Sequence, residues 1–461
     1  MKNRWIALLL ALVLTLGMLP TAFALDTAEA FETDQKLEAE NIPFPEVLGA
    51  YTDGTEPAAE EAADDMLAVQ QSAEEPLPEL PELTREELVQ ALLQRQTRED
   101  GEAAAQLEDE LEPCGNNGQY TGPGGRVSSA SAFATAVGGS SYASVSGNTV
   151  KLLRNSVPKQ TITMSGNFTV DLNGHQLFNN DFIGDDHFYA LLISESGTQT
   201  LIDSKFSANS NKSGFWGALC TQGGSVIAKS CYIMQTEIFN GSFTGSNISV
   251  YALGNSGNRV TVSNSVINCS YTFGGTSYLT NCYFYYDEDN HRSISVKGGS
   301  VTISGWNTLV DGYIGMYGGS LTIEEGNFGH EGIPCAFLSA GTVQINDGRF
   351  IQSLNLSSDS TAEVTIDGGE FYAEDEKDLS LVQYGGTVTI NDGDWYSSTE
   401  EDPDSTSTTT VLERCLKAAG GELDITGGEF YGKLHIVGGS TIVDGGVFYD
   451  TVWVENENKL N

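Results

Sequence analysis

Carboxylates whose spacing suits acid–base chemistry occur late in the chain. Asp392 and Asp394 lie two residues apart, and Glu370 holds the position of Asp394 in the preceding copy of a short repeat. Two carboxyl groups at such a spacing can approach the separation that inverting glycosidases use, roughly 6.5–9.5 Å. The segment Asn391-Asp392-Gly393 is also an ordinary turn sequence. A glycosidase-like pair and a solvated turn are therefore alternatives at this point.

Residue types that bind metals show no metal-site spacing in the sequence. The five histidines are scattered, no Cys-x-x-Cys occurs, and neither an EF-hand loop nor the glycine-rich nonapeptide of calcium-binding β-rolls is present. Acids on adjacent repeats, such as Glu370 with Asp394 or Glu325 with Asp347, could hold a hard cation weakly. We expect a solvated acidic face, no cofactor, and at most weak surface calcium.

The carboxylates belong to a short unit that recurs in the last third of the chain. Each copy alternates apolar and polar residues, stops at a turn containing glycine, and restarts with an aromatic residue. Alternation with a period of two predicts strands, and a repeat of this length has no room for a helix. Such units bury their apolar sides only by stacking, so the sequence predicts a β-solenoid. The copies are 341–350, 362–371, 386–395, 421–430 and 439–448, with a looser one at 320–328.

Stacking would place equivalent residues of adjacent copies about 4.8 Å apart, so columns of the alignment become ladders. In one polar column no two neighbouring rungs both carry a carboxylate, as expected because like charges on facing positions repel. The predicted interior aliphatic ladder contains Ile323, Ile345, Ile366, Ile390, Ile425 and Val443. The predicted aromatic ladder contains Phe328, Phe350, Phe371, Trp395, Phe430 and Phe448. The predicted polar ladder contains Glu324, Asn346, Asp367, Asn391, Thr426 and Asp444.

Upstream of these copies the strand pattern is weaker but continuous. The run from Phe168 to His175, Phe-Thr-Val-Asp-Leu-Asn-Gly-His, is followed by Gln176-Leu177 and by repeated Gly-Gly-x-apolar-x-Ile segments. These motifs resemble the early coils of pectate-lyase-like right-handed parallel β-helix proteins, which occur among secreted and surface proteins of bacteria. The resemblance covers 148–449 and, at ~22 residues per coil, implies about 14 coils stacked at the strand spacing. We therefore expect an all-β chain with a right-handed parallel β-helix over 114–461.

Members of that superfamily that cleave polysaccharides use clustered carboxylates, often calcium, and an Arg or Lys base. The nearest match is Asp185-Asp186-His187, but the accompanying Asn-Thr-Asp and Gly-His-Gly motifs are missing and no Arg-x-Lys follows. A solvated loop after Gly184 is the favoured interpretation. No catalytic residue is assigned, and the candidate binding residues are Asp185, Asp186, His187, Asp392, Asp394 and Glu370.

The N-terminal region has a different character from the repeats. Residues 1–24 combine Lys2 and Arg4, an apolar run and an Ala-x-Ala cleavage site, which is typical of a signal peptide rather than of a membrane anchor. Residues 25–113 hold 26 acidic and four basic residues among Ala and Pro. Such a composition buries too little apolar surface to offset its ordering entropy, so a disordered linker is expected, with a helix near 84–112. The mature protein should be extracellular, secreted or attached to a cell surface.

Seven cysteines leave at least one unpaired. One interpretation buries most of them as small apolar residues of the solenoid interior. The alternative pairs Cys220 with Cys231, or Cys269 with Cys282, between or within coils.

The formal net charge of −41 argues against nucleic acid and anionic lipid as partners. Three functions are left open. The first is a non-catalytic secreted or surface protein that binds glycans or host cell-surface components, as adhesins do. The others are a polysaccharide lyase or glycoside hydrolase of the same fold, and a passive spacer. The candidate aromatic contacts are Tyr251, Tyr271, Tyr283, Tyr285 and Tyr286.

Overall fold

The computed structural model describes residues 120–178, 190–206, 213–285, 292–330, 332–373, 379–397 and 414–455. Contacts divide the chain into Met1–Leu77 and Pro78–Asn461, and every described residue belongs to the second unit. The signal peptide, the acidic linker and the helix near 84–112 lie outside the described residues. Among the described residues, no helix combines the length and the apolar character needed to cross a membrane.

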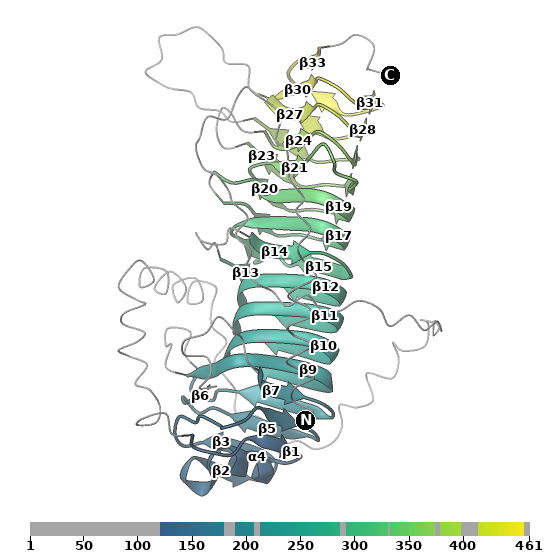
Figure 1. Ribbon diagram of the computed structural model, residues 1–461. Helices are drawn as coiled ribbons and strands as arrows, with labels where there is room; N and C mark the ends of the chain where they lie inside the picture. Colours follow the sequence, from purple (N-terminus) through teal and green to yellow (C-terminus); the bar gives the residue numbers. More distant parts are fainter. Residues whose placement is uncertain are drawn as a thin grey trace, which may run out of the picture. The chain divides into compact units, whose positions relative to one another are not determined.

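The described part of the chain is a parallel β-solenoid of about 12 turns (Figure 1), which confirms the predicted all-β fold class. Its 33 strands are hydrogen-bonded into one continuous sheet. Parallel pairing from turn to turn forms three faces, here called A, B and C in chain order. Insertions lengthen some turns of the solenoid. Leu381 pairs with Leu416, for example, across a turn of 35 residues.

The strands of each face follow directly from the pairing. Face A contains β1 (Gly125–Val127), β4 (Ile162–Met164), β7 (Ala190–Ser194), β14 (Arg292–Val296), β21 (Leu354–Leu356), β24 (Leu381–Gln383), β27 (Arg414–Ala418), β30 (Lys433–Ile436) and β33 (Val452–Val454). Face B contains β3 (Thr149–Leu152), β5 (Phe168–Asp171), β8 (Thr198–Ile202), β15 (Ser300–Ser304), β22 (Glu363–Ile366), β25 (Thr387–Ile390), β28 (Glu422–Ile425) and β31 (Ser440–Val443).

Face C is built from short strands, and six longer strands pass around corners. Face C contains β6 (Gln176–Phe178), β13 (Tyr283–Phe284), β16 (Leu309–Val310), β18 (Asn327–Phe328), β20 (Arg349–Ile351), β23 (Glu370–Tyr372), β26 (Asp394–Tyr396), β29 (Glu429–Phe430) and β32 (Val447–Phe448). The strands β9 (Gly214–Lys229), β10 (Tyr232–Ser246), β11 (Ser249–Ser263) and β12 (Val266–Thr280) run through faces C, A and B, whereas β17 (Tyr313–Ile323) and β19 (Ala336–Ile345) join A to B.

A helix and a hairpin close the first turn. Helix α4 (Ala130–Val137) begins at Ser129, whose side chain accepts a hydrogen bond from the Ala132 amide and so satisfies a free N–H of the first helical turn. The helix packs on β1, β3 and β5 and is followed by the 3-10 turn η2 (Gly139–Ser141). The strand β2 (Ala143–Ser146) pairs with β3 antiparallel, unlike the other strand pairs described. The apolar inner end of the first turn is thereby covered, with Phe133 fully buried.

The three predicted ladders are confirmed. The aliphatic column pairs in register from Ile323 to Val443. In the aromatic column the ring centroids are separated by 4.8, 4.8, 4.0, 6.0 and 4.6 Å from Phe328 to Phe448. The polar column is linked from rung to rung: the Asn391 amide donates to Asp367 and the Thr426 hydroxyl donates to Asn391. The register of the repeats could therefore be predicted from the sequence.

The turns between β10 and β12 follow a tighter period that the sequence reasoning missed. Tyr232 pairs with Ser249 and Ser249 with Val266, so each turn takes 17 residues. At the corner between faces B and C the backbone is left-handed, with positive φ at Ser230, Asn247, Asn264 and Asn281. Asparagine tolerates this conformation better than most residues, so a Ser/Thr-Asn pair recurring every 17 residues was the available signal.

The described cysteines are buried thiols. Six are buried and form no disulfide among the described residues, whereas Cys114 lies outside those residues. The alternative pairings of Cys220 with Cys231 and of Cys269 with Cys282 were wrong. Burial raises the pKa of the Cys282, Cys335 and Cys415 thiols to about 12, which keeps them protonated and unreactive.

Candidate functional site

Two of the predicted binding residues come together, and a third forms a turn. Asp185, Asp186 and His187 lie outside the described residues. Asp394 pairs with Glu370 on the preceding turn of face C and with Glu429 on the following turn. Asp392 is exposed and its Oδ1 accepts a hydrogen bond from the Gly393 amide at 2.9 Å, so it forms the turn that the sequence offered as an alternative.

The acidic column Glu370, Asp394 and Glu429 is coupled to tyrosines. Burial raises the pKa of Asp394, with further contributions from Glu429, Glu370 and Asp392. The Tyr372 hydroxyl donates to Glu370 at 2.9 Å, and the Tyr431 hydroxyl donates to Glu429 at 2.5 Å. Two of the three carboxylates therefore have partners within the solenoid.

Those tyrosines form a second ladder, on the outer side of face C. Tyr372, Tyr396, Tyr431 and Tyr449 occupy four consecutive turns, and their ring centroids are 4.7, 4.8 and 4.7 Å apart with nearly parallel planes. Rings stacked so closely cover each other's faces. Only the ring edges and hydroxyls between the two ends of this ladder can meet a ligand, so it is a poor platform for stacking sugars.

A different arrangement occurs on the outer side of face A, where Glu237 is the one carboxylate on the described strands of that face. Its Oε1 accepts a hydrogen bond from the Gln235 amide at 2.9 Å. Gly254 pairs with Glu237 one turn along, and a Cβ at Gly254 would collide with the Glu237 carboxyl group. The carboxyl group therefore lies over the space that the glycine leaves.

The environment of Glu237 changes its protonation. Burial raises its pKa to about 7, although the hydrogen bond from Gln235 lowers it. Near neutral pH the carboxyl group is thus shared between its protonated and ionised forms. It can donate or accept a hydrogen bond, as recognition of a hydroxyl group requires. A carboxyl group with such a pKa could also act as a general acid.

Beside Glu237 runs a column of exposed aromatic residues. Phe239, Phe273 and Tyr317 are 36%, 38% and 38% exposed. They directly follow Ile238, Thr272 and Met316, which fall in one register column, with one turn between successive members. Two turns of the solenoid, about 9.6 Å at the spacing of paired strands, therefore separate the backbone positions of successive rings. The strand pairing shifts at this corner, directly after Ile238, Asn255 and Met316.

The residues between these rings are not aromatic. The turn between Phe239 and Phe273 carries Ser256, which pairs with Gly274. The turn between Phe273 and Tyr317 carries Lys297, whose ammonium lies 5.1 Å from the Phe273 centroid. The three rings cannot stack on one another at twice the strand spacing. At this spacing the rings do not cover one another, in contrast to the tyrosine ladder of face C, but the Lys297 ammonium lies over the Phe273 ring and the Tyr317 ring lies over Gly315.

The tyrosines predicted from the sequence as glycan contacts differ in their exposure to solvent. Tyr251 is 39% exposed, but Tyr271 is only 6% exposed. Tyr283 donates a hydrogen bond to Asp311 at 3.3 Å, and Tyr285 is partly buried. Tyr286 lies outside the described residues. Phe239, Phe273 and Glu237 were missed. The 34-residue separation of the two phenylalanines, twice the 17-residue period, would have pointed to a shared column.

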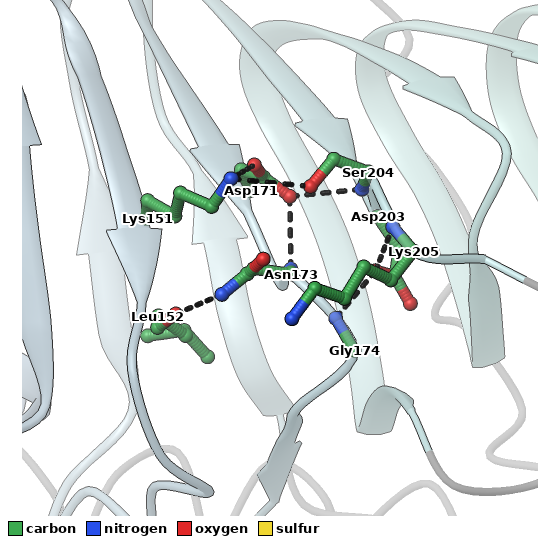
Figure 2. A network of polar contacts seen from close by, with 8 residues as sticks. All are labelled: Lys151, Leu152, Asp171, Asn173, Gly174, Asp203, Ser204 and Lys205. Atoms are coloured by element: carbon green, nitrogen blue, oxygen red, sulfur yellow. Dashed lines mark hydrogen bonds and ion pairs between the residues drawn. The ribbon is translucent and has the colours of Figure 1, made fainter.

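The motif that carried the family resemblance has a structural role (Figure 2). The Asp171 Oδ1 accepts hydrogen bonds from the Asn173 and Ser204 amides, at 2.8 and 2.9 Å. The Asp203 Oδ1 accepts from the Gly174 and Lys205 amides, at 2.7 and 3.0 Å. Each aspartate thus closes its own turn and binds the neighbouring turn, so the network joins two coils.

Metal coordination has no support in the described part of the chain, where no group of three or more His, Cys, Asp or Glu side chains could hold a metal ion.

Comparison with known proteins adds no assignment, since no family, curated protein or solved structure matches the chain.

Proposed function

We propose that this chain is a secreted or cell-surface solenoid that binds glycans along the outer side of face A without cleaving them. The observation that carries the proposal is the column of Phe239, Phe273 and Tyr317, exposed on alternate turns beside the Glu237–Gln235 pair. Aromatic faces next to a few oriented polar groups are the usual composition of a site for a small polar ligand. The signal-peptide pattern at 1–24 supports export, and the partners would be glycans of a cell surface.

The spacing of the rings suits a chain of sugars. Backbone positions of the rings about 9.6 Å apart, two strand spacings, match the length of a disaccharide unit closely enough for alternate sugars to meet successive rings. The Glu237 carboxyl group and the Gln235 amide lie beside the first ring and offer both donors and acceptors. Recognition of this kind requires neither a metal nor another cofactor.

A polysaccharide-cleaving enzyme is the second candidate, and the raised pKa of Glu237 is the observation that favours it. A carboxyl group with a pKa of about 7 is suited to protonate a leaving group. Glycoside hydrolysis uses two carboxyl groups within about 10 Å of each other. The register places one further described carboxylate near Glu237, that of Glu195 two turns away, and the Arg126 guanidinium binds it. This difference makes binding without cleavage the favoured function.

The test is a screen of the full chain on immobilised glycans, including polygalacturonate, with products measured in parallel. We expect retention on at least one glycan without release of reducing ends or unsaturated products. Product release would replace the binding proposal with the enzymatic one, and absence of any retention would refute both.

A pair of double variants assigns the surface. Phe239→Ala with Phe273→Ala should weaken binding by about tenfold or more, because each stacked ring contributes about 1 kcal/mol. The matched control, Tyr372→Ala with Tyr431→Ala, removes two outward tyrosines of face C and should leave affinity within twofold. Equal losses in the two double variants would contradict the assignment to face A.

A further inference from the structure

The last turns of face A carry a cluster of cations that is unusual for so acidic a chain. Arg414, Lys417 and Lys433 account for three of the 22 lysines and arginines, against 63 acidic residues. Arg414 pairs with Lys433 in the register of β27 and β30, and Lys417 pairs with His435. These four residues, here called the basic cluster, therefore share the two neighbouring strands.

Contacts bring Arg414 and His435 together. The Arg414 Nη1 is 3.2 Å from the His435 Nδ1, and the His435 Nε2 is 2.9 Å from the Glu455 Oε1. A guanidinium group can only donate, so Nδ1 accepts and the ring proton lies on Nε2, which donates to Glu455. His435 is therefore neutral in this arrangement. Its pKa is lowered chiefly by burial, opposed by Glu455 and reinforced by Arg414 and Lys417.

Aromatic rings line the same surface. The His435 ring stacks on Trp453 with centroids 4.2 Å apart, and the Arg414 guanidinium lies 6.0 Å from the Trp453 centroid. The Lys417 ammonium lies 3.2 Å from the Tyr384 hydroxyl and 5.2 Å from its ring centroid. Trp453 is 42% exposed.

The cations lack acidic partners in the described part of the chain. Arg414 contacts a neutral imidazole and Lys417 a phenol, and neither forms an ion pair there. Lys433 is 7% exposed, and no ion pair or hydrogen bond of its ammonium is formed with described residues. The Glu455 carboxylate is 2.9 Å from the His435 Nε2 and accepts its hydrogen bond. Arg414 and Lys417 are partly exposed and Lys433 is buried. Three neighbouring cations without an acidic partner among the described residues favour an external anion.

We propose that the basic cluster binds a sulfate ester of an acidic polysaccharide. A tetrahedral oxyanion offers three terminal oxygens to the Arg414 fork and the lysine ammonium groups, whereas a carboxylate offers two. Trp453 and Tyr384 supply aromatic surface for the sugar that carries the ester. Tyr384 also continues the register column of Phe239, Phe273 and Tyr317, so a long glycan on face A would extend toward these cations. This inference rests on the proposed function in that the ligand is a glycan.

The experiment titrates the full chain with heparin, and with a chemically desulfated heparin that keeps its carboxylates. We expect desulfated heparin to bind at least about tenfold more weakly. The double variant Arg414→Gln with Lys417→Gln should weaken heparin binding by about tenfold per cation removed, the usual worth of a charge-assisted hydrogen bond.

A matched variant controls for net charge and for cation–aromatic contact. Arg349 lies 4.8 Å over Tyr372 on face C and Lys159 is exposed, so Arg349→Gln with Lys159→Gln removes two positive charges elsewhere. Its heparin affinity should stay within twofold of the unmodified chain. If the Arg414 and Lys417 double variant does not reproduce the circular dichroism of the unmodified chain, Lys417→Gln alone takes its place.

Each outcome decides between the claims. Equal binding of desulfated heparin, or heparin binding unaffected by the Arg414 and Lys417 changes, overturns the sulfate site. If neutral glycans are still retained in that case, the proposed function stands without it. If no glycan of any kind is retained, the proposed function fails first and the sulfate site fails with it.

Discussion

Aromatic residues are placed in two different ways on the outer faces of this solenoid. On face C, Tyr372, Tyr396, Tyr431 and Tyr449 occupy consecutive turns and stack at 4.7–4.8 Å. On face A, Phe239, Phe273 and Tyr317 occupy alternate turns, separated by Ser256 and Lys297. The same strand spacing therefore produces a closed ladder on one face and separate rings on the other.

The difference shows how one repeat geometry can serve stability or binding. Parallel stacking gives each inner ring of the tyrosine ladder two ring neighbours, and the hydroxyls of Tyr372 and Tyr431 reach the acidic column. Skipping a turn gives up the ring-to-ring contact on face A, so these rings are not covered by one another. Four changes to the chain would break or sharpen this contrast.

The largest change in stability is expected from a substitution on the inner side of face C. Trp395 is fully buried between Phe371 and Phe430, with centroid distances of 4.0 and 6.0 Å. Trp395→Ala should lower the free energy of unfolding by about 3–5 kcal/mol because it leaves a cavity in a closely packed column. Urea denaturation measures this loss. Glycan binding by folded protein should be unchanged, and a loss below 1 kcal/mol would show that the ladder is not structural.

Glu237 should make stability depend on pH. Its pKa of about 7 lies above the ordinary value of 4.5, so the folded state holds the proton more tightly than the unfolded state. Its contribution to stability is fully present below pH 4.5 and is lost as pH rises to about 7, by at most about 3 kcal/mol.

Melting temperatures of the unmodified chain and of Glu237→Gln across that range measure the contribution. The variant should lose less stability than the unmodified chain between pH 4.5 and 8. Parallel pH profiles would place the carboxyl group in water rather than over Gly254.

A smaller effect on glycan affinity is expected from a substitution that gives face A the ring pattern of face C. Ser256→Phe inserts a ring between Phe239 and Phe273, which closes their faces by stacking and should weaken glycan binding by about tenfold. Ser256→Ala is the control, since the Ser256 Oγ is buried and no described residue forms a hydrogen bond with it. Calorimetric titration compares the two. Tighter binding in the phenylalanine variant would mean that ring number, and not face access, governs affinity.

The smallest effect concerns the hydroxyls of the exposed ladder. Tyr431→Phe removes the hydrogen bond to Glu429 and keeps the ring stack. Because Tyr431 is 40% exposed, we expect no measurable change in melting temperature or in glycan binding. A clear loss of glycan affinity would move the binding surface toward face C.

Part of this organisation could be predicted from the sequence. The last five repeat copies can be aligned because two columns agree on the register. Ile345 and Ile366 belong to the aliphatic column, and Asn346 and Asp367 belong to the polar column. Two independent constraints on one offset leave little freedom, since a shift by one residue would exchange inner and outer sides.

The turns from β9 to β12 and the candidate site could not be read in the same way. Their interior includes Thr236, Ser270 and Asn255, all buried, so the alternation of apolar and polar residues is weak there. The raised pKa of Glu237 depends on burial and on a glycine one turn away, which is visible only once the register is known. Outward rings such as Phe239 carry no interior constraint, and only their spacing along a column marks them.

The central claim, that ring faces on alternate turns of face A bind the glycan, is tested most directly by hydroxyl-radical footprinting of the full chain with and without a retained glycan. The account predicts reduced oxidation of Phe239, Phe273 and Tyr317 in the presence of the glycan, with oxidation of Tyr372, Tyr396, Tyr431 and Tyr449 unchanged. Protection of the four tyrosines of face C, with unchanged oxidation of Phe239 and Phe273, would contradict it.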